Sequence, residues 1–272
     1  MTKNLDQEGL SSIADKYSLF YIDLWGVVHN GISLHKEATK VLDKLSKIKK
    51  DYVLLTNAPR PSEPVKNFLE KMGLKKEIRD HVFTSGEAAL NYLKKNFLNK
   101  KFFHIGPPRD FDLFNDFKNM KSRDLDEIEY ILCTGLFDEQ NKDLRYYKNL
   151  LEKKIDKKMI CTNPDLIVDK GNNRELCAGS VALVFEKLGG EVVYFGKPYP
   201  EVYKQSINNK NKKILCIGDN LNTDIKGANL LNYDSLLISN GIHKSEIEKD
   251  GLDQVFKNYE AICNYTQAEL KW

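Results

Sequence analysis

Short apolar runs alternate with segments of helical periodicity along the chain, and this alternation limits the folds that the sequence can adopt. The runs at 19–22 and 52–55 have the length of buried strands. Between them, the segment 38–48 repeats its apolar residues at helical spacing. This order of strand, helix and strand predicts an α/β fold built on a parallel sheet.

The same pattern continues to the end of the chain. Ser62 can cap a helix that stops at Gly73, and Thr84 with Glu87 has the spacing of a capping box. Further strands are expected at 102–105, 130–133, 158–161, 192–195, 214–217 and 235–238, and further helices at 112–119, 144–151 and 180–188. We interpret the middle of the chain as an inserted α/β module, so the expected domains are 1–99, 100–191 and 192–272, the first and last forming one core.

Composition excludes several classes of protein. The 272 residues are 41% hydrophobic, which excludes general disorder, and 42 basic residues nearly balance 39 acidic ones, which argues against a nucleic-acid partner. No apolar stretch approaches the roughly 20 residues that span a bilayer, so no membrane partner is expected. The N-terminal residues have no apolar signal core, and the five cysteines have no CxxC spacing. We therefore expect a cytoplasmic protein with reduced thiols.

Two acids follow apolar runs that are far apart in the sequence. Asp23 follows the run at 19–22, and Asp219 follows the run at 214–217. The carboxyl ends of parallel strands share one edge of a sheet, where ligands bind. Asp23 can attack phosphorus and bind a cation, Asp219 can be a second ligand, and Asp224 can orient it. Oxygen ligands in octahedral geometry favour Mg²⁺ over zinc, so the expected cofactor is Mg²⁺.

Other polar residues follow two more of the expected strands. Thr56 and Asn57 come after the run at 52–55, where a hydroxyl and backbone N–H groups can hold phosphate oxygens. Lys197 comes after the run at 192–195, and its ammonium can balance the charge of an aspartate and a phosphate. Each residue alone is common turn chemistry, but the ordered set is far more specific.

That ordered set resembles the haloacid dehalogenase (HAD) superfamily. The four motifs are DLWGV with Asp23, LLTN with Thr56, GKP with Lys197, and GDNLNTD with Asp219 and Asp224. The inserted module resembles the cap of the class IIA branch, which includes NagD-type nucleotidases, nitrophenylphosphatases and pyridoxal phosphate phosphatases. The resemblance implies a Rossmann-like three-layer core with an α/β cap, and a partner that is a small phosphorylated substrate. It implies hydrolysis of a phosphate monoester through an aspartyl-phosphate, and caps of this branch often take part in homodimer contacts.

One position departs from the phosphatase pattern. Family phosphatases usually carry a second aspartate two residues after the nucleophile, as a general acid and base, and here that residue is Trp25. The resemblance implies that the Trp25 carbonyl still binds the metal, but an indole offers no titratable proton. His29 and His243 are candidates for the missing proton transfer. Either histidine can equally cap a helix or face solvent.

Trp25 leaves two other functions open. The first is a phosphate- or nucleotide-binding homologue of the HAD fold that turns over slowly or not at all. The second is a dehalogenase, because dehalogenases of this superfamily have an aromatic residue at the same position. Asp219 and Asp224 argue against dehalogenation, since further carboxylates around Asp23 repel one another unless a cation is bound.

Two segments of the inserted module are candidate substrate contacts. Asn163 and Asp165 lie in a turn by composition, and Gly179 lies where a helix begins, with free N–H groups that can meet an anion. The resemblance implies that these segments face the active site. A turn followed by a helix start explains the same residues equally well, so both interpretations stay open.

Overall fold

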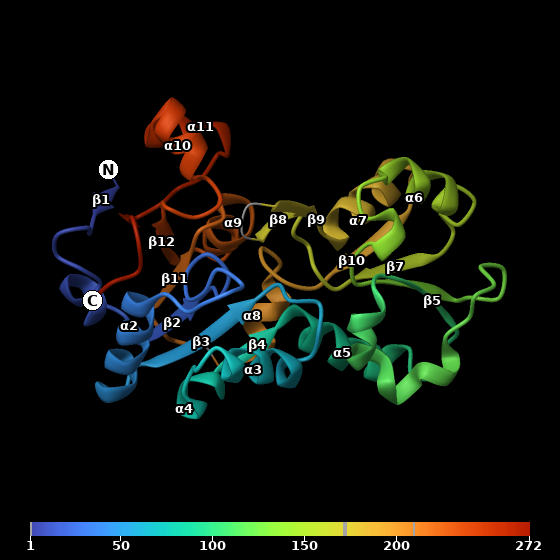
Figure 1. Ribbon diagram of the computed structural model, residues 1–272, viewed down its shortest axis with the longest axis horizontal. Coiled ribbons are helices and arrows are strands. Elements are labelled where there is room, and N and C mark those ends of the chain that lie inside the picture. The colour runs from blue at the N-terminus through green and yellow to red at the C-terminus, as the bar shows by residue number, and fades with distance from the viewer. Residues whose placement is uncertain (1, 171–172, 209) are drawn as a thin grey trace. The chain divides into compact units, whose positions relative to one another are not determined.

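The computed structural model describes residues 2–170, 173–208 and 210–272, and it divides into two compact units (Figure 1). Unit 1 contains both ends of the chain and consists of residues 1–56, 66–83 and 203–272. Unit 2 consists of residues 57–65 and 84–202. Each unit has its own parallel sheet, and each is described by itself below.

Unit 1 is built on a seven-stranded sheet that combines the two ends of the chain. The strand order is β1-β13-β12-β11-β2-β3-β4, and the pairings from β1 to β3 along this order are parallel. In Figure 1 the blue strands β2 and β3 accordingly lie beside the orange strands β11 and β12. The strands are β1 (Lys3–Asn4), β2 (Leu19–Ile22), β3 (Asp51–Thr56), β4 (Val82–Thr84), β11 (Ile214–Gly218), β12 (Asp234–Ile238) and β13 (Tyr265–Gln267).

Helices connect the strands of unit 1, and the apolar spacing of the sequence accounts for them. In α2 (Lys36–Lys47), Ala38, Val41, Leu42 and Leu45 are buried, as expected for a helix with one apolar stripe. The π-helical turn η3 (Leu221–Ile225) leads directly into α9 (Lys226–Leu230), and both contact β12. The other helices are α1 (Ser11–Ala14), α3 (Ser62–Lys71), which continues from unit 2, α4 (Lys76–Arg79), α8 (Pro200–Ser206), α10 (Lys244–Asp250) and α11 (Leu252–Asn258).

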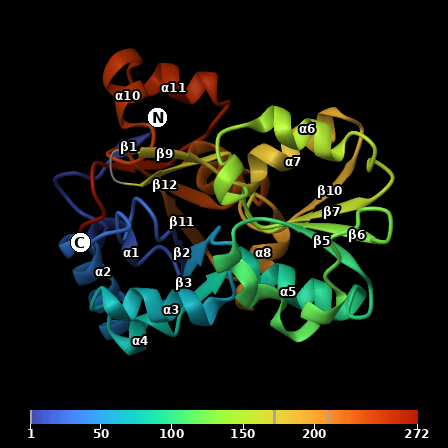
Figure 2. The ribbon, with the colours of Figure 1, turned by 45° about the vertical axis from the view of Figure 1, so that its right-hand side comes forward.

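Unit 2 is built on a four-stranded parallel sheet in the order β10-β7-β6-β5. Helices α6 and α7 lie on one face of this sheet and α5 on the other (Figure 2). A hairpin of β8 and β9 is antiparallel. The elements are α5 (Ser85–Asn96), β5 (Phe102–Ile105), η1 (Pro108–Met120), β6 (Tyr130–Cys133), η2 (Asp138–Gln140), α6 (Leu144–Leu151), β7 (Lys158–Cys161), β8 (Ile167–Lys170), β9 (Asn173–Leu176), α7 (Ala178–Lys187) and β10 (Glu191–Tyr194).

The N-cap half of the expected capping box at the start of α5 is present, while the Glu87 carboxylate accepts a hydrogen bond from the Ser62 N–H at 2.9 Å. The Thr84 hydroxyl accepts a hydrogen bond from the Glu87 backbone N–H at 2.9 Å. Ser62 is the first residue of α3, but its buried hydroxyl has no hydrogen-bond partner among the described residues, so the expected cap by Ser62 is wrong. Gly73 follows the helix with a φ of 88°, which suits a residue without a Cβ. The helix boundaries in this region were therefore readable from local chemistry.

The expected helix at 112–119 is wrong in type. The segment η1 has the tighter 3-10 geometry, and Phe114 and Phe117 within it have non-helical backbone angles. The rings of both residues pack edge-on against the ring of Phe102, at centroid distances of 5.4 and 5.8 Å. This tertiary packing bends the backbone away from the regular helix that the spacing predicts.

The predicted fold class is confirmed: each unit has a parallel sheet with flanking helices. The domain boundaries stay a prediction. Strand β10, most of which falls in the range expected for the second half of the core, pairs with β7 in the four-stranded sheet. All five cysteines are buried and free of disulfides. Among the described residues, no helix combines the length and the apolar character needed to cross a bilayer.

Candidate functional site

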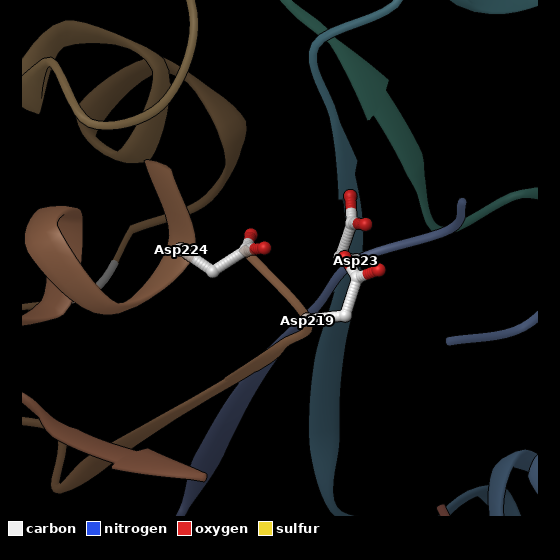
Figure 3. A group of neighbouring side chains, drawn as sticks. All are labelled: Asp23, Asp219 and Asp224. Atoms are coloured by element: carbon white, nitrogen blue, oxygen red, sulfur yellow. The ribbon is translucent and has the colours of Figure 1, made fainter. Parts of the chain in front are cut away.

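Three aspartates of unit 1 lie together at the carboxyl edge of the seven-stranded sheet (Figure 3). Asp23 directly follows β2, Asp219 directly follows β11, and Asp224 lies in the turn η3. The parallel register pairs Ile22 with Ile217, which brings the ends of β2 and β11 to the same level. One carboxylate oxygen from each aspartate lies within 4.8 Å of the others, and their exposed fractions are only 8%, 7% and 3%. The sequence prediction that these acids meet is confirmed.

Glycines make room for this cluster. A Cβ on Gly26 or on Gly241 would overlap the Asp219 side chain, and a Cβ on Gly218 would overlap the Asp224 carboxylate. Gly26 also has a φ of 83°, a backbone angle that residues with a Cβ rarely adopt. The Gly of DLWGV is therefore a packing requirement of the acid cluster, and sequence reasoning did not single it out.

Backbone N–H groups hold two of the carboxylates in place. The Ile242 N–H donates to Asp219 Oδ2 at 3.0 Å, and the Asn220 N–H donates to Asp224 Oδ2 at 3.1 Å. These donors come from the loop after β12 and from the loop that begins η3. Such bonds fix the direction of two carboxylates within a buried cluster of three acids.

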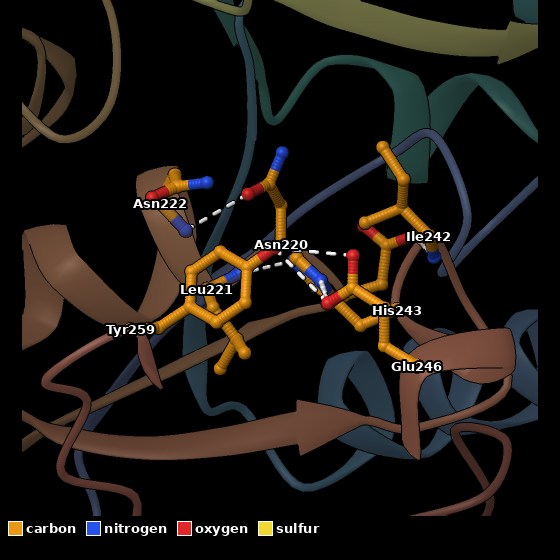
Figure 4. Close-up of polar contacts among 8 residues, drawn as sticks. Asn220, Leu221, Asn222, Ile242, His243, Glu246 and Tyr259 are labelled. Atoms are coloured by element: carbon orange, nitrogen blue, oxygen red, sulfur yellow. Dashed lines mark hydrogen bonds and ion pairs between the residues drawn. The ribbon is translucent and has the colours of Figure 1, made fainter. Parts of the chain in front are cut away.

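His243 supports the same loop through its side chain (Figure 4). Its Nε2 accepts a hydrogen bond from the Leu221 backbone N–H at 3.1 Å, so Nδ1 carries the proton and faces Glu246 Oε2 at 3.2 Å. The Tyr259 hydroxyl donates to the same carboxylate. His243 is thus engaged in holding the turn that follows Asp219, which is the role of a structural histidine.

Trp25 and His29 pack within one loop of unit 1. The Trp25 indole lies over Gly31, where a Cβ would be 2.5 Å from its ring, and it meets the His29 ring edge-on at 5.2 Å. His29 Nδ1 accepts a hydrogen bond from the Gly31 N–H at 3.0 Å, and its ring also contacts Phe68. Burial is the main cause that lowers the pKa of His29 to about 4, with a smaller contribution from the charge of His35. His29 is therefore neutral near pH 7.

Thr56 occupies the end of β3, the strand next to β2. The register pairs Leu54 with Ile22, so Thr56 lies at the same edge of the sheet as Asp23. The side chain of Thr56 is buried. Its placement at this edge agrees with the sequence analysis, while its contact with a phosphate remains a prediction.

Asn57 and Lys197 lie together in unit 2. Asn57 Oδ1 accepts a hydrogen bond from the Lys197 N–H at 2.7 Å, and Asn57 Nδ2 donates to the Lys197 carbonyl at 2.9 Å. The exposed fractions of the two residues are 5% and 4%. The structure thus joins two motifs that are 140 residues apart in the sequence.

The three predicted substrate residues of the inserted module also lie together. Asn163 Oδ1 accepts a hydrogen bond from the Asp165 N–H at 2.9 Å, and the Asp165 carbonyl accepts one from the Gly179 N–H at 3.2 Å. A Cβ on Gly179 would overlap the Pro164 carbonyl, so the turn packs directly on the start of α7. Asp165 Oδ1 in turn accepts a hydrogen bond from Asn57 Nδ2 at 3.0 Å. Sequence reasoning placed these residues near a substrate, but it missed that they bond to one another.

Comparisons with known proteins agree with this arrangement of motifs. Residues 20–118 match the family described as haloacid dehalogenase-like hydrolase, and residues 194–262 match a second family described as HAD-hydrolase-like. These two matches contain Asp23, Thr56, Lys197, Asp219 and Asp224. The chain belongs to the haloacid dehalogenase-like hydrolases.

Individual relatives of this hydrolase family point the same way. A haloacid dehalogenase-like family hydrolase from Brucella suis shares 28% identity and a TM-score of 0.83, and the match covers 97% of this chain and 99% of that one. The 4-nitrophenylphosphatase of Schizosaccharomyces pombe is 25% identical, over 87% of this chain and 89% of that protein. The dihydroxyacetone phosphatase of Corynebacterium glutamicum is 32% identical, but over only 31% of this chain and 32% of that protein. The predicted family is confirmed, and the neighbours are consistent with the class IIA branch.

Proposed function

We propose that this HAD-family hydrolase is a Mg²⁺-dependent phosphatase of a small phosphorylated metabolite. The observation that carries the proposal is the buried cluster of Asp23, Asp219 and Asp224 at the carboxyl edge of the sheet. The names of the relatives, 4-nitrophenylphosphatase and dihydroxyacetone phosphatase, support phosphate monoesters as the class of substrate.

The residues of the cluster fit a magnesium ion. The group consists of carboxylates alone, and their ligand oxygens lie within 4.8 Å of one another. Hard oxygen donors suit Mg²⁺, and buried like charges need a cation between them. Asp23, Asp219 and the Trp25 carbonyl would bind the ion, with Asp224 in support. When bound, the ion would neutralise charge on the phosphoryl oxygens.

The remaining residues would carry out the reaction. An Asp23 carboxylate oxygen forms a bond to phosphorus, while the bond between phosphorus and the leaving oxygen breaks and that oxygen takes the electron pair. Thr56 and Lys197 would hold the phosphoryl oxygens during this transfer. Water then attacks phosphorus, the bond to Asp23 breaks, and phosphate is released. The leaving oxygen takes up one proton from solvent and the attacking water gives one up to solvent, so the overall reaction balances as hydrolysis of the ester.

The substitution Asp23→Asn tests this proposal. The variant should hydrolyse a panel of phosphate monoesters no faster than buffer containing Mg²⁺ does, and the wild type should lose its activity in a chelator. Mass spectrometry of quenched reactions should find phosphorylated Asp23 in the wild type only. Asp43→Asn, on the surface helix α2 of the same unit, is the matched control and should retain full activity. Full turnover by Asp23→Asn would exclude the mechanism.

Trp25 favours a second candidate function, a HAD homologue that binds phosphate or nucleotide and turns over slowly. The indole packs on Gly31. Of the two candidate histidines, His29 accepts a hydrogen bond from the Gly31 N–H and His243 accepts one from the Leu221 N–H. General acid and base assistance is typically worth about 10²–10⁴-fold. If its loss limits the protein, Trp25→Asp should raise hydrolysis of an aryl phosphate by a large factor, and Trp25→Phe should not. A wild type that already turns over rapidly would exclude this second candidate.

A further inference from the structure

The Asn57 side chain is fully engaged by protein groups. Its Oδ1 accepts from the Lys197 N–H, and its Nδ2 donates both to the Lys197 carbonyl and to Asp165 Oδ1. The orientation of the amide is fixed, because a backbone N–H can only donate and a carbonyl can only accept. Sequence analysis expected a hydroxyl and backbone N–H groups at Thr56 and Asn57 to hold phosphate, which stays a prediction. The side-chain amide of Asn57 makes three hydrogen bonds of 3.0 Å or less.

The bonds to Lys197 fix its backbone at two points. Donor and acceptor of the same residue are both bonded to one side-chain amide, so the peptide units on either side of Lys197 cannot rotate freely. Gly196 permits this approach, because it has a φ of 119° and a Cβ there would lie 2.6 Å from Asn57 Oδ1. The sequence GKP therefore provides both the lysine and the space for the amide that holds it.

The bond to Asp165 extends the connection into the inserted module. Asp165 belongs to a turn that is fixed by Asn163 and by the start of α7 at Gly179. A displacement of this turn would move the Asp165 carboxylate, and with it the amide that holds Lys197. Hydrogen-bonded chains of buried groups transmit such displacements because an unmade bond is costly.

We propose that the Asn57 side chain positions Lys197 by coupling it to the turn 163–165, and that this side chain does not itself contact phosphate. This inference rests on the proposed function for the role of Lys197 in the reaction. The state of the turn would then set the placement of the lysine backbone, so that the two respond to a substrate together. The Asn57 side chain acts on the reaction only through its bonds to Lys197 and Asp165.

Exchanging the side chains of residues 57 and 165 tests the coupling between the turn and Lys197. Asn57→Asp replaces the amide donor by a second carboxylate that faces Asp165 and the Lys197 carbonyl, and we expect kcat/KM to fall about tenfold or more. Adding Asp165→Asn restores a donor opposite the new carboxylate. The double variant should therefore recover the part of the loss that comes from Asp165, mainly in kcat, while the Lys197 carbonyl still lacks its donor. Asp165→Asn alone should change kcat/KM less than Asn57→Asp does.

Direct contact with phosphate predicts the opposite outcome for the double variant. A carboxylate at position 57 would repel phosphate whatever residue stands at 165, so a folded double variant without recovery would overturn the proposal. Thermal unfolding monitored by circular dichroism checks that each variant folds. Ser62→Ala, elsewhere in the first segment of unit 2, is the control that should leave kcat/KM unchanged.

Hydrogen exchange tests the coupling without any turnover. Asp165→Ala should speed amide exchange in peptides that contain Lys197, because the Asn57 amide loses one of the groups that hold it. Unchanged exchange there would contradict the coupling, even if Asn57→Asp did not fold. If the wild type shows no activity that depends on Asp23, the proposed function fails, and the exchange result still decides whether Asn57 links the two segments.

Discussion

The carboxyl edges of the two sheets both bury polar side chains, but they do so with different chemistry. The edge in unit 1 gathers three carboxylates, and backbone N–H groups orient two of them. The edge in unit 2 gathers Asn57, Lys197 and Asp165, whose polar groups bond to one another. Under the proposed function a bound cation would balance the charge of the first arrangement, whereas the polar groups of the second bond to one another. One sheet edge thus carries a cluster of acids, and the other carries hydrogen bonds that hold the backbone of Lys197.

The largest effect is expected from a methyl group inside the acid cluster. Gly26→Ala would force a Cβ into the Asp219 carboxylate at a positive φ. We expect a loss of about 2–4 kcal/mol in the free energy of unfolding from overpacking and backbone strain. Mg²⁺ affinity should fall about 10–100-fold, as when other supports of metal ligands are lost. Urea unfolding and calorimetric Mg²⁺ titration measure the two effects.

Gly73→Ala separates strain from overlap. Gly73 lies in the same unit with a φ of 88°, but nothing lies within 4 Å of a Cβ there. The variant Gly73→Ala should lower the free energy of unfolding by about 1–2 kcal/mol, from the strain of the left-handed backbone alone, and should leave Mg²⁺ affinity unchanged. Equal Mg²⁺ affinities for the two variants would show that Gly26 does not shape the cluster.

The next effect concerns a single buried acid of unit 2. Asp110 lies beside Thr134, which follows β6, and burial is the main cause that raises the pKa of Asp110 to about 6. The Thr134 hydroxyl and the charges of Arg109 and Arg60 oppose this shift, and Asp138 adds to it. The folded protein therefore keeps the proton more tightly than the unfolded chain does, so stability falls as pH rises from about 4 to about 6.

Asp110→Asn should remove this dependence. The variant should match the wild type near pH 4 and gain up to about 3 kcal/mol in the free energy of unfolding above pH 6. Urea unfolding between pH 4 and pH 8 measures the difference in the free energy of unfolding. Asp138→Asn, which is exposed, should change little. A gain that is the same at all pH values would show that Asp110 is not the titrating group.

The smallest change in stability is expected from substitutions at His243 and Tyr259, which support the loop after Asp219. His243→Ala leaves the buried Leu221 N–H without its acceptor, which should cost about 1–3 kcal/mol. Tyr259→Phe removes only a hydroxyl that donates to Glu246 at the surface, and it should change stability by no more than about 0.5 kcal/mol. Thermal unfolding of both variants makes the comparison. An equal loss in both would mean that the Glu246 contact, and not Leu221, carries the effect.

Much of the fold was readable from the sequence because its signals are local. Strand β2 and helix α6 begin and end where the apolar runs do, and Thr84 caps α5 through the predicted bond to Glu87. The segment η1 was misjudged because its backbone follows the packing of Phe114 and Phe117 on Phe102. The spacing of apolar residues indicates which side of a segment is buried, but it does not indicate which side chains pack against that side.

For the candidate site, the sequence by itself determined which residues carry charge and at which strand ends they lie. Asp23 and Asp219 were paired in advance because parallel strands end at one edge, which depends only on topology. Only the tertiary structure decided what these residues bond to. Asn57 holds Lys197 and Asp165, and His243 holds Leu221, because distant segments fold against them. A hydrogen bond depends on distances of a few tenths of an ångström and on direction, and residue type alone fixes neither.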